Sequence, residues 1–213
     1  METTDKQQKL ILSLLEQVRD ADEPVFSYAV PNIFSKRLAS FAMIREDVLF
    51  SKSAFESLIQ LKAQAEQDSI IISSLYYAAI IQYGRCFNEN KGGHSKLEPS
   101  DIFTDQDVEV NKTHTELMDL RNSFVAHRDD NEYEQAVVIM QIPKENAEES
   151  RVGFIIKSLK TISPSEEKLQ SYIELCNYLM PKIEEKIQKA GDKTHDSLFK
   201  NFEPKYIEML RIK

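Results

Sequence analysis

The stretch His114–Asp130, HTELMDLRNSFVAHRDD, is the segment around which the expected helical fold is organised. Leu117, Leu120 and Phe124 recur at spacings of three and four residues, which is typical of one face of an α-helix. Three polar residues are set into this half-apolar segment, namely Arg121, Asn122 and His127. The stretch closes on His127-Arg128-Asp129-Asp130. We interpret this helix end as the part of the chain that carries the chemistry, held in place by the remainder.

The chain before this stretch is predicted to be almost wholly helical. Residues 69–87, SIIISSLYYAAIIQYGRCF, are apolar nearly all round, so this helix is expected in the core or at a subunit contact, with Asp68 as its N-cap. Apolar periodicity predicts further helices over residues 6–19, 32–45 and 53–67. A short helical turn is expected at 98–103, within the loop-like residues 88–107, and the motif helix at 108–126.

The pattern changes period after the motif helix. Residues 136–142 and 152–156 are rich in β-branched side chains, which predicts a β-hairpin at about 135–158. Because an isolated hairpin is marginally stable in water, we expect it to pack on the helices. Ser163-Pro164-Ser165-Glu166 is typical of a helix start. The following helix is expected to kink or split at Pro181 and to end at Gly191, with one or two short helices in the tail.

These patterns predict one domain over residues 1–213, a mainly α, up-and-down helical bundle with one added β-hairpin and C-terminal helices over 163–213. The chain has only 5 glycines and 7 prolines, which favours long helices over a many-turned β architecture. Its 213 residues, 41% of them hydrophobic, suffice for a single core.

Charge and cysteine content narrow the classes of function. Residues 1–106 carry 11 Lys/Arg and 15 Asp/Glu, and residues 107–213 carry 16 and 20, so each half has a formal charge of −4. This balance argues against a broad basic surface for nucleic acid and leaves room only for a local patch. Cys86 and Cys176 stand alone, which suits a reducing compartment and gives no zinc spacing. With no signal peptide or membrane span predicted, we expect a cytoplasmic protein.

Arg121, Asn122 and His127 together suit chemistry at a phosphate. A guanidinium offers a planar fork to phosphate oxygens, and a histidine exchanges a proton near neutral pH. These groups fit cleavage of a phosphodiester by a ribose 2′-hydroxyl, which needs no metal. On an ideal helix, at about 100° per residue, Arg121 and His127 lie about 120° apart. They converge only where the helix ends near His127, or where a second chain completes the pocket.

The Arg-polar-x4-His pattern resembles the motif of HEPN domains, helical-bundle proteins found among ribonuclease toxins and phage-defence systems. The phrase LRNSFVAHRD resembles the abortive-infection branch in particular, and the resemblance covers roughly residues 69–130. It implies a metal-independent endoribonuclease without cofactor, acting on RNA as a homodimer with two motifs across one cleft. It further implies that Arg121 stabilises the transition state, that His127 is the general acid/base and that Asn122 orients a partner. To this set we add Arg85 and Arg128 as candidate substrate contacts. Asp129 and Asp130 depart from what the resemblance implies, because two carboxylates close to His127 would raise its pKa or repel RNA.

Alternative interpretations remain open for these residues. An arginine and a histidine near a helix C-terminus are favoured by the helix dipole alone. The alternative function is a non-catalytic helical dimer that serves as a protein or RNA interaction module. Binding of a protein partner, an antitoxin among the possibilities, through its dimer surface or hairpin fits the acidic balance better. We expect His114 to be solvated, and His94 and His195 to have no ligand partners, so no metal site is predicted. Tyr76, Tyr77 and Tyr83 are expected in the core or at an interface, and the thiol of Cys86 is expected to be buried and inert.

Overall fold

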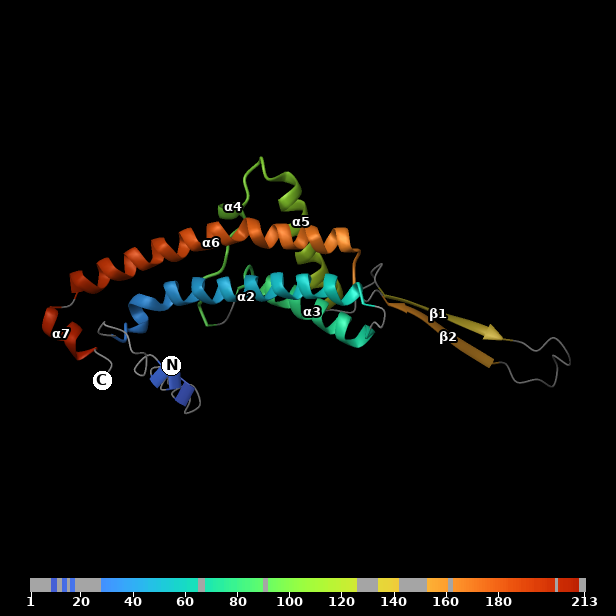
Figure 1. Ribbon diagram of the computed structural model, residues 1–213, viewed down its shortest axis with the longest axis horizontal. Coiled ribbons are helices and arrows are strands. Elements are labelled where there is room, and N and C mark those ends of the chain that lie inside the picture. Colours follow the sequence, from blue (N-terminus) through green and yellow to red (C-terminus); the bar gives the residue numbers. More distant parts are fainter. Residues whose placement is uncertain are drawn as a thin grey trace. The chain divides into compact units, whose positions relative to one another are not determined.

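The computed structural model describes residues 9–10, 13–14, 16–17, 28–64, 68–89, 92–125, 134–141, 153–160, 163–201 and 203–210. Its long helices are α2 (Asn32–Lys62), α3 (Ser69–Arg85), α5 (Val108–Asp119) and α6 (Glu166–Asn201), with short helices α4 (Pro99–Ile102) and α7 (Pro204–Met209) (Figure 1). Strands β1 (Glu134–Gln141) and β2 (Gly153–Lys160) form an antiparallel hairpin. The predicted class, mainly helical with one hairpin, is confirmed. The helix expected at residues 6–19 lies largely outside the described residues.

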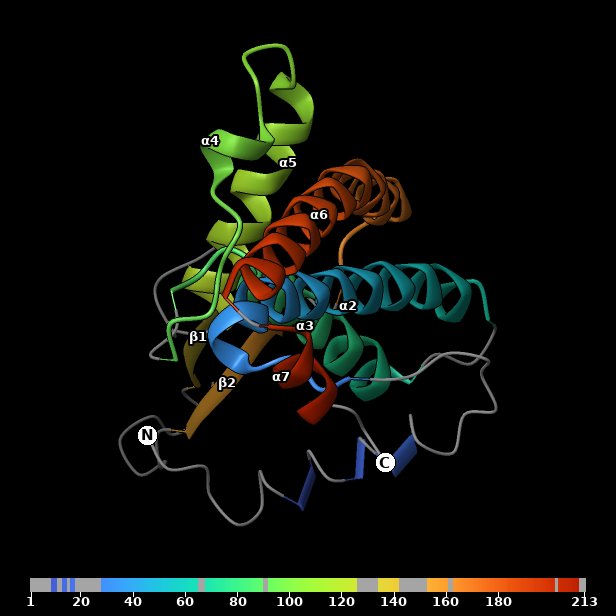
Figure 2. The same ribbon diagram turned by 90° about the vertical axis from the view of Figure 1, so that its left-hand side faces the viewer.

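Two compact units divide the chain, one of residues 40–185 and the other of the described parts of 1–39 and 186–213. In the unit of residues 40–185, α2 runs beside α3 and α6 (Figures 1 and 2). The Ser51 hydroxyl of α2 donates to the Ala79 carbonyl oxygen of α3 at 3.0 Å. The ring centroids of Phe55 and Tyr172 are 5.2 Å apart, which joins α2 to α6. Large apolar side chains of the three helices fill this core, among them Leu58, Ile80, Tyr83, Leu169, Leu175, Leu179 and Ile183.

The other unit is held by contacts between its two chain segments. The Thr194 hydroxyl donates to the Phe34 carbonyl oxygen at 3.0 Å and to the Ala190 carbonyl oxygen at 2.8 Å. The Ala29 amide donates to the Leu210 carbonyl oxygen at 2.8 Å. A backbone hydrogen bond between residues about 180 positions apart thus joins the two segments of this unit.

Several predicted helix boundaries are wrong, because the helices continue where the sequence indicates breaks. The expected helices 32–45 and 53–67 form one helix, α2, and the Ser51 hydroxyl bonds back to the Asp47 carbonyl oxygen inside it at 2.9 Å. Helix α6 runs through Pro181 and past Gly191 to Asn201. Pro181 is exposed, so tertiary packing of the buried neighbours Leu179 and Ile183 holds the helix across the missing amide donor.

Helix α3 matches its prediction closely. Asp68 caps it, because one of its carboxylate oxygens accepts hydrogen bonds from the amides of Ile70 at 2.8 Å and Ile71 at 3.2 Å. Tyr76 and Tyr83 are buried, as expected. The hairpin, in contrast, does not bury its side chains on the helices: those described on β1 are all exposed, and on β2 only Ile155 is half-buried.

Candidate functional site

The motif segment is not a regular α-helix throughout. Helix α5 ends at Asp119, and residues Leu120–Val125 form a π-helical turn with wider i→i+5 bonding. Arg121 and Asn122 lie on this turn. The separation of about 120° between Arg121 and His127, which assumes α-helical geometry, therefore does not apply here. Short π-helical segments inside helices occur frequently at functional sites.

Arg121 and Asn122 are held together on the π-helical turn. An Nη atom of Arg121 donates to the side-chain carbonyl oxygen of Asn122 at 2.9 Å. Arg121 is half-buried and Asn122 exposed. Within the described part of the chain, no carboxylate pairs with the Arg121 guanidinium. The amide therefore orients the arginine, and among the residues that the structure describes its other guanidinium N–H groups have no carboxylate partner.

Gly84 of α3 supports the aliphatic stem of Arg121. A Cβ atom added at Gly84 would lie 2.8 Å from Cγ of Arg121 and 3.3 Å from its Cδ. The arginine stem therefore occupies the space that any other residue at position 84 would fill. Sequence reasoning missed this residue, although a signal exists: a glycine inside an apolar helix costs helix propensity and usually has a packing reason.

His127 and Arg128 lie outside the described residues. The predicted approach of His127 to Arg121 over a shared phosphate therefore stays a prediction, as does the substrate contact of Arg128. Their closest described neighbours in sequence are the π-helical turn residues ending at Val125.

Arg85 faces α2 instead of joining Arg121. One Nη atom of Arg85 lies 3.6 Å from an Asp47 carboxylate oxygen and also donates to the Gln82 side chain. Partial burial raises the pKa of Asp47 above its ordinary value, and the Arg85 guanidinium opposes this rise. The side chain of Arg85 is still 52% exposed, so a second, solvent-side contact remains open to it.

His114 is buried, which corrects the expectation that it is solvated. It is 6% exposed and is surrounded by the rings of Phe87 and Phe103, whose centroids lie 4.4 Å and 4.8 Å from its own. A hydrogen bond of 2.7 Å joins its Nδ1 to the hydroxyl of Tyr83, which is itself buried. Burial lowers the pKa of His114 to about 4. At neutral pH this histidine is therefore an uncharged part of the core that joins α5 to α3.

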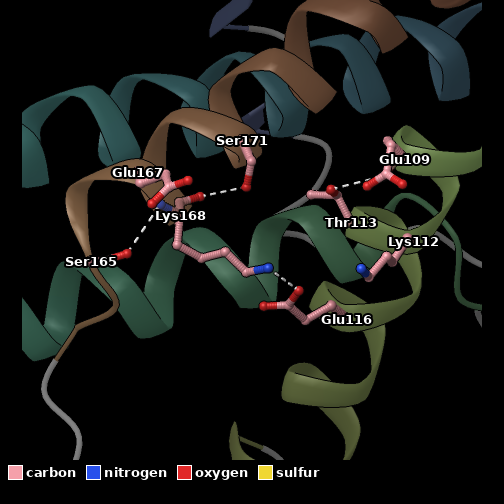
Figure 3. A pocket seen from close by; sticks show the side chains of 8 residues that line it. All are labelled: Glu109, Lys112, Thr113, Glu116, Ser165, Glu167, Lys168 and Ser171. Atoms are coloured by element: carbon pink, nitrogen blue, oxygen red, sulfur yellow. Dashed lines mark hydrogen bonds and ion pairs between the residues drawn. The ribbon is translucent and has the colours of Figure 1, made fainter.

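A polar hollow of about 330 Å³ lies between α5 and the first turns of α6 (Figure 3). Glu116 accepts hydrogen bonds there from Lys168 and from the Tyr172 hydroxyl, the latter at 2.9 Å. The Glu116 carboxylate in the hollow is thus already paired with Lys168 and Tyr172. Of the sequence-predicted site residues, the three that the structure describes (Arg85, Arg121 and Asn122) do not line the hollow. The described side chains of its walls are polar or charged: Glu109, Lys112, Thr113, Glu116, Ser165, Glu167, Lys168 and Ser171.

The described residues contain neither a cluster suited to a metal ion nor a membrane-spanning helix. No group of three or more His, Cys, Asp or Glu side chains is arranged to hold a metal ion there. None of the helices, over the residues described, has both the length and the apolar character needed to cross a membrane. Comparison of the chain with family models, curated proteins and solved structures finds no match.

Proposed function

We propose that this chain is a metal-independent endoribonuclease of the HEPN type, acting on RNA in the cytoplasm in phage defence or in a toxin–antitoxin pair. In this proposal a ribose 2′-hydroxyl attacks the adjacent phosphorus, the O2′–P bond forms and the P–O5′ bond breaks. His127 takes the proton of the 2′-hydroxyl, and a protonated imidazole supplies the proton that the leaving O5′ needs. Arg121 stabilises the charge on the phosphate oxygens.

The observation that carries the proposal is the pairing of Arg121 with Asn122 on a π-helical turn. The pairing orients the guanidinium and, among the described residues, leaves it without a carboxylate partner. A phosphate is a suitable ligand for an oriented guanidinium that lacks such a partner. In this proposal Asn122 therefore orients the Arg121 guanidinium as well as the bound RNA. Arg85 and Arg128 contribute accessory phosphate contacts, and a second copy of the chain supplies the other half of the cleft.

Cleavage of RNA by the purified chain in the presence of EDTA tests the proposal. We expect wild type to cut, and His127→Ala and Arg121→Ala to lose cutting while keeping the helical circular dichroism of wild type. Arg45→Ala is a matched control, because it removes one arginine charge from α2 where the side chain pairs with Glu46 at 3.0 Å and Glu184 at 3.6 Å. Full cutting by His127→Ala, or none by wild type, would remove the enzymatic proposal.

A second candidate function is a non-catalytic module that binds a protein partner, an antitoxin among the possibilities. The exposed apolar side chains of the hairpin favour it, as does the net charge of −8. This candidate predicts that His127 is buried and hydrogen-bonded within one chain. Histidine modification by diethyl pyrocarbonate separates the two: rapid modification of His127 fits the enzyme, and protection of His127 in the isolated chain fits the module.

A further inference from the structure

A buried hydrogen bond joins α5 to α3 beside the contact that supports Arg121. The Tyr83 hydroxyl and Nδ1 of His114 lie 2.7 Å apart, and both residues are buried. Tyr83 directly precedes Gly84, the α3 residue that faces the Arg121 stem. Adjacent residues of α3 therefore make both contacts, one with α5 and the other with the π-helical turn that continues it.

The motif segment makes the same two contacts from one face. His114, Leu117 and Arg121 are spaced by three and then four residues, as side chains that share a helix face are. Leu117, between the two contacts, is fully buried. Helix α5 crosses α3 instead of running along it, so only a short length of each helix can touch the other (Figures 1 and 2). Few side chains therefore decide how α5 is placed on α3.

The hydrogen bond restricts this placement more closely than the apolar contacts around it. Burial raises the pKa of Tyr83 well above its ordinary value and lowers that of His114 to about 4, so both groups are uncharged at neutral pH. A shift of α5 on α3 would leave the Tyr83 hydroxyl in the core without this partner, which is unfavourable. Hydrogen bonds depend on distance and angle, whereas apolar burial has no preferred direction.

We propose that Tyr83 and His114 are positioning residues for Arg121, an inference that rests on the proposed role of this arginine at a phosphate. Their hydrogen bond sets α5 on α3 and thereby fixes the π-helical turn that carries the guanidinium. With the turn fixed, the stem of Arg121 lies against Gly84 and its guanidinium bonds to Asn122. The accuracy matters because a misplacement of about 1 Å can lower a catalysed rate about 100-fold.

Two substitutions at His114 separate positioning from packing. His114→Phe keeps a ring beside Phe87 and Phe103 but offers no group that can bond to the Tyr83 hydroxyl. His114→Asn loses the ring and leaves a cavity, but its amide offers both an acceptor and a donor close to the place of Nδ1. If packing alone mattered, the asparagine variant would be the more impaired. Positioning predicts that the phenylalanine variant is.

Cleavage of RNA in the presence of EDTA gives the first readout, at a temperature where circular dichroism shows every variant folded. We expect Tyr83→Phe and His114→Phe to lower kcat at least about tenfold with KM within about threefold, because Arg121 acts in the transition state. His114→Asn should keep kcat within about threefold of wild type. Tyr172→Phe is the matched control: it removes a buried hydroxyl that bonds to Glu116 of α5 at 2.9 Å from the side of α6, and it should keep kcat.

The Nε–Hε group of Arg121 gives a second readout, which needs no cleavage. Its NMR signal is identified by its loss in Arg121→Lys. In wild type we expect an order parameter near that of rigid backbone, about 0.85, because Gly84 and Asn122 confine the side chain. It should fall below about 0.6 in Tyr83→Phe and His114→Phe and keep its wild-type value in His114→Asn.

The two readouts separate failure of the positioning role from failure of the enzymatic proposal. An unchanged order parameter of Arg121 in Tyr83→Phe would overturn the positioning role. Equal loss of kcat in His114→Asn and His114→Phe, with both variants folded, would overturn it as well. If wild type cuts no RNA, the enzymatic proposal fails, and the order parameters still decide whether Tyr83 and His114 hold Arg121 in place.

Discussion

Replacing Gly84 by alanine probes the contact between α3 and the Arg121 stem. Alanine in place of glycine inside a helix is favourable by about 0.5–1 kcal/mol, because glycine loses more backbone entropy on folding. Here the added Cβ would meet Cγ of Arg121 at 2.8 Å, so the π-helical turn or the arginine has to move. Overpacking of this kind costs about 1–3 kcal/mol. We expect Gly84→Ala to lower the free energy of unfolding by about 0.5–2 kcal/mol.

Removing the arginine stem should reverse the sign of this effect. In Arg121→Ala, the closest remaining atom of residue 121 is Cβ, 3.5 Å from the added methyl group, which is ordinary van der Waals contact. Gly84→Ala in that background should therefore stabilise by about 0.5–1 kcal/mol. Gly191→Ala in α6 is the matched control for helix propensity, because nothing lies within 4 Å of its added Cβ. It should stabilise in either background.

Urea unfolding followed by circular dichroism measures all of these variants. For a chain of this size, 1 kcal/mol corresponds to a change of about 2–4 °C in Tm, which gives an independent thermal check. The reasoning would be refuted if Gly84→Ala stabilised the wild-type chain as much as Gly191→Ala does, or if the sign of its effect were the same with and without Arg121.

Three further predictions follow from buried or interrupted positions. Burial lowers the pKa of His114 from 6.5 to about 4, so the unfolded chain binds the extra proton first, and stability is lost as the pH falls from 6.5 towards 4. At about 1.4 kcal/mol per pH unit, the loss of stability approaches about 3 kcal/mol. This pH-dependent loss should be absent in His114→Phe. A pKa near 6.5 for His114 in an NMR titration of the folded chain would contradict the prediction. Pro181→Ala should raise the free energy of unfolding by about 1–3 kcal/mol, because it restores an amide donor inside α6; a decrease on urea unfolding would count against this. Burial raises the pKa of Cys86 and brings that of Cys176 to about 12, so both thiols should react with Ellman's reagent only after unfolding, and rapid reaction of the native chain would disagree.

The features that could be predicted from the sequence are those set by local patterns. The all-round apolar character of residues 69–87 predicts a core helix, and α3 is one, capped by Asp68 as expected. The change to β-branched alternation predicts the hairpin. Both depend on residues close together in the chain, where periodicity and capping act directly.

The features that could not be predicted depend on distant segments. His114 lies on α5, but the rings that cover it come from Tyr83, Phe87 and Phe103, which no local pattern brings together. The continuity of α6 through Pro181 likewise depends on packing and overrides the local breaker. At the candidate site, the residue types of Arg121 and Asn122 were visible, whereas their mutual hydrogen bond and the supporting role of Gly84 required coordinates.

Because Leu120–Val125 form a widened turn, the position of Arg121 depends on the number of residues in this segment as well as on their types. An i→i+5 turn uses one residue more than an i→i+4 turn. Deleting a single residue between Leu117 and Arg121 would remove the residue that the wider turn accommodates and would change the position of the arginine relative to Gly84. Among related chains, we expect substitutions to be tolerated in this segment more often than gaps, and a chain with a gap here to have lost the glycine at the facing position on α3.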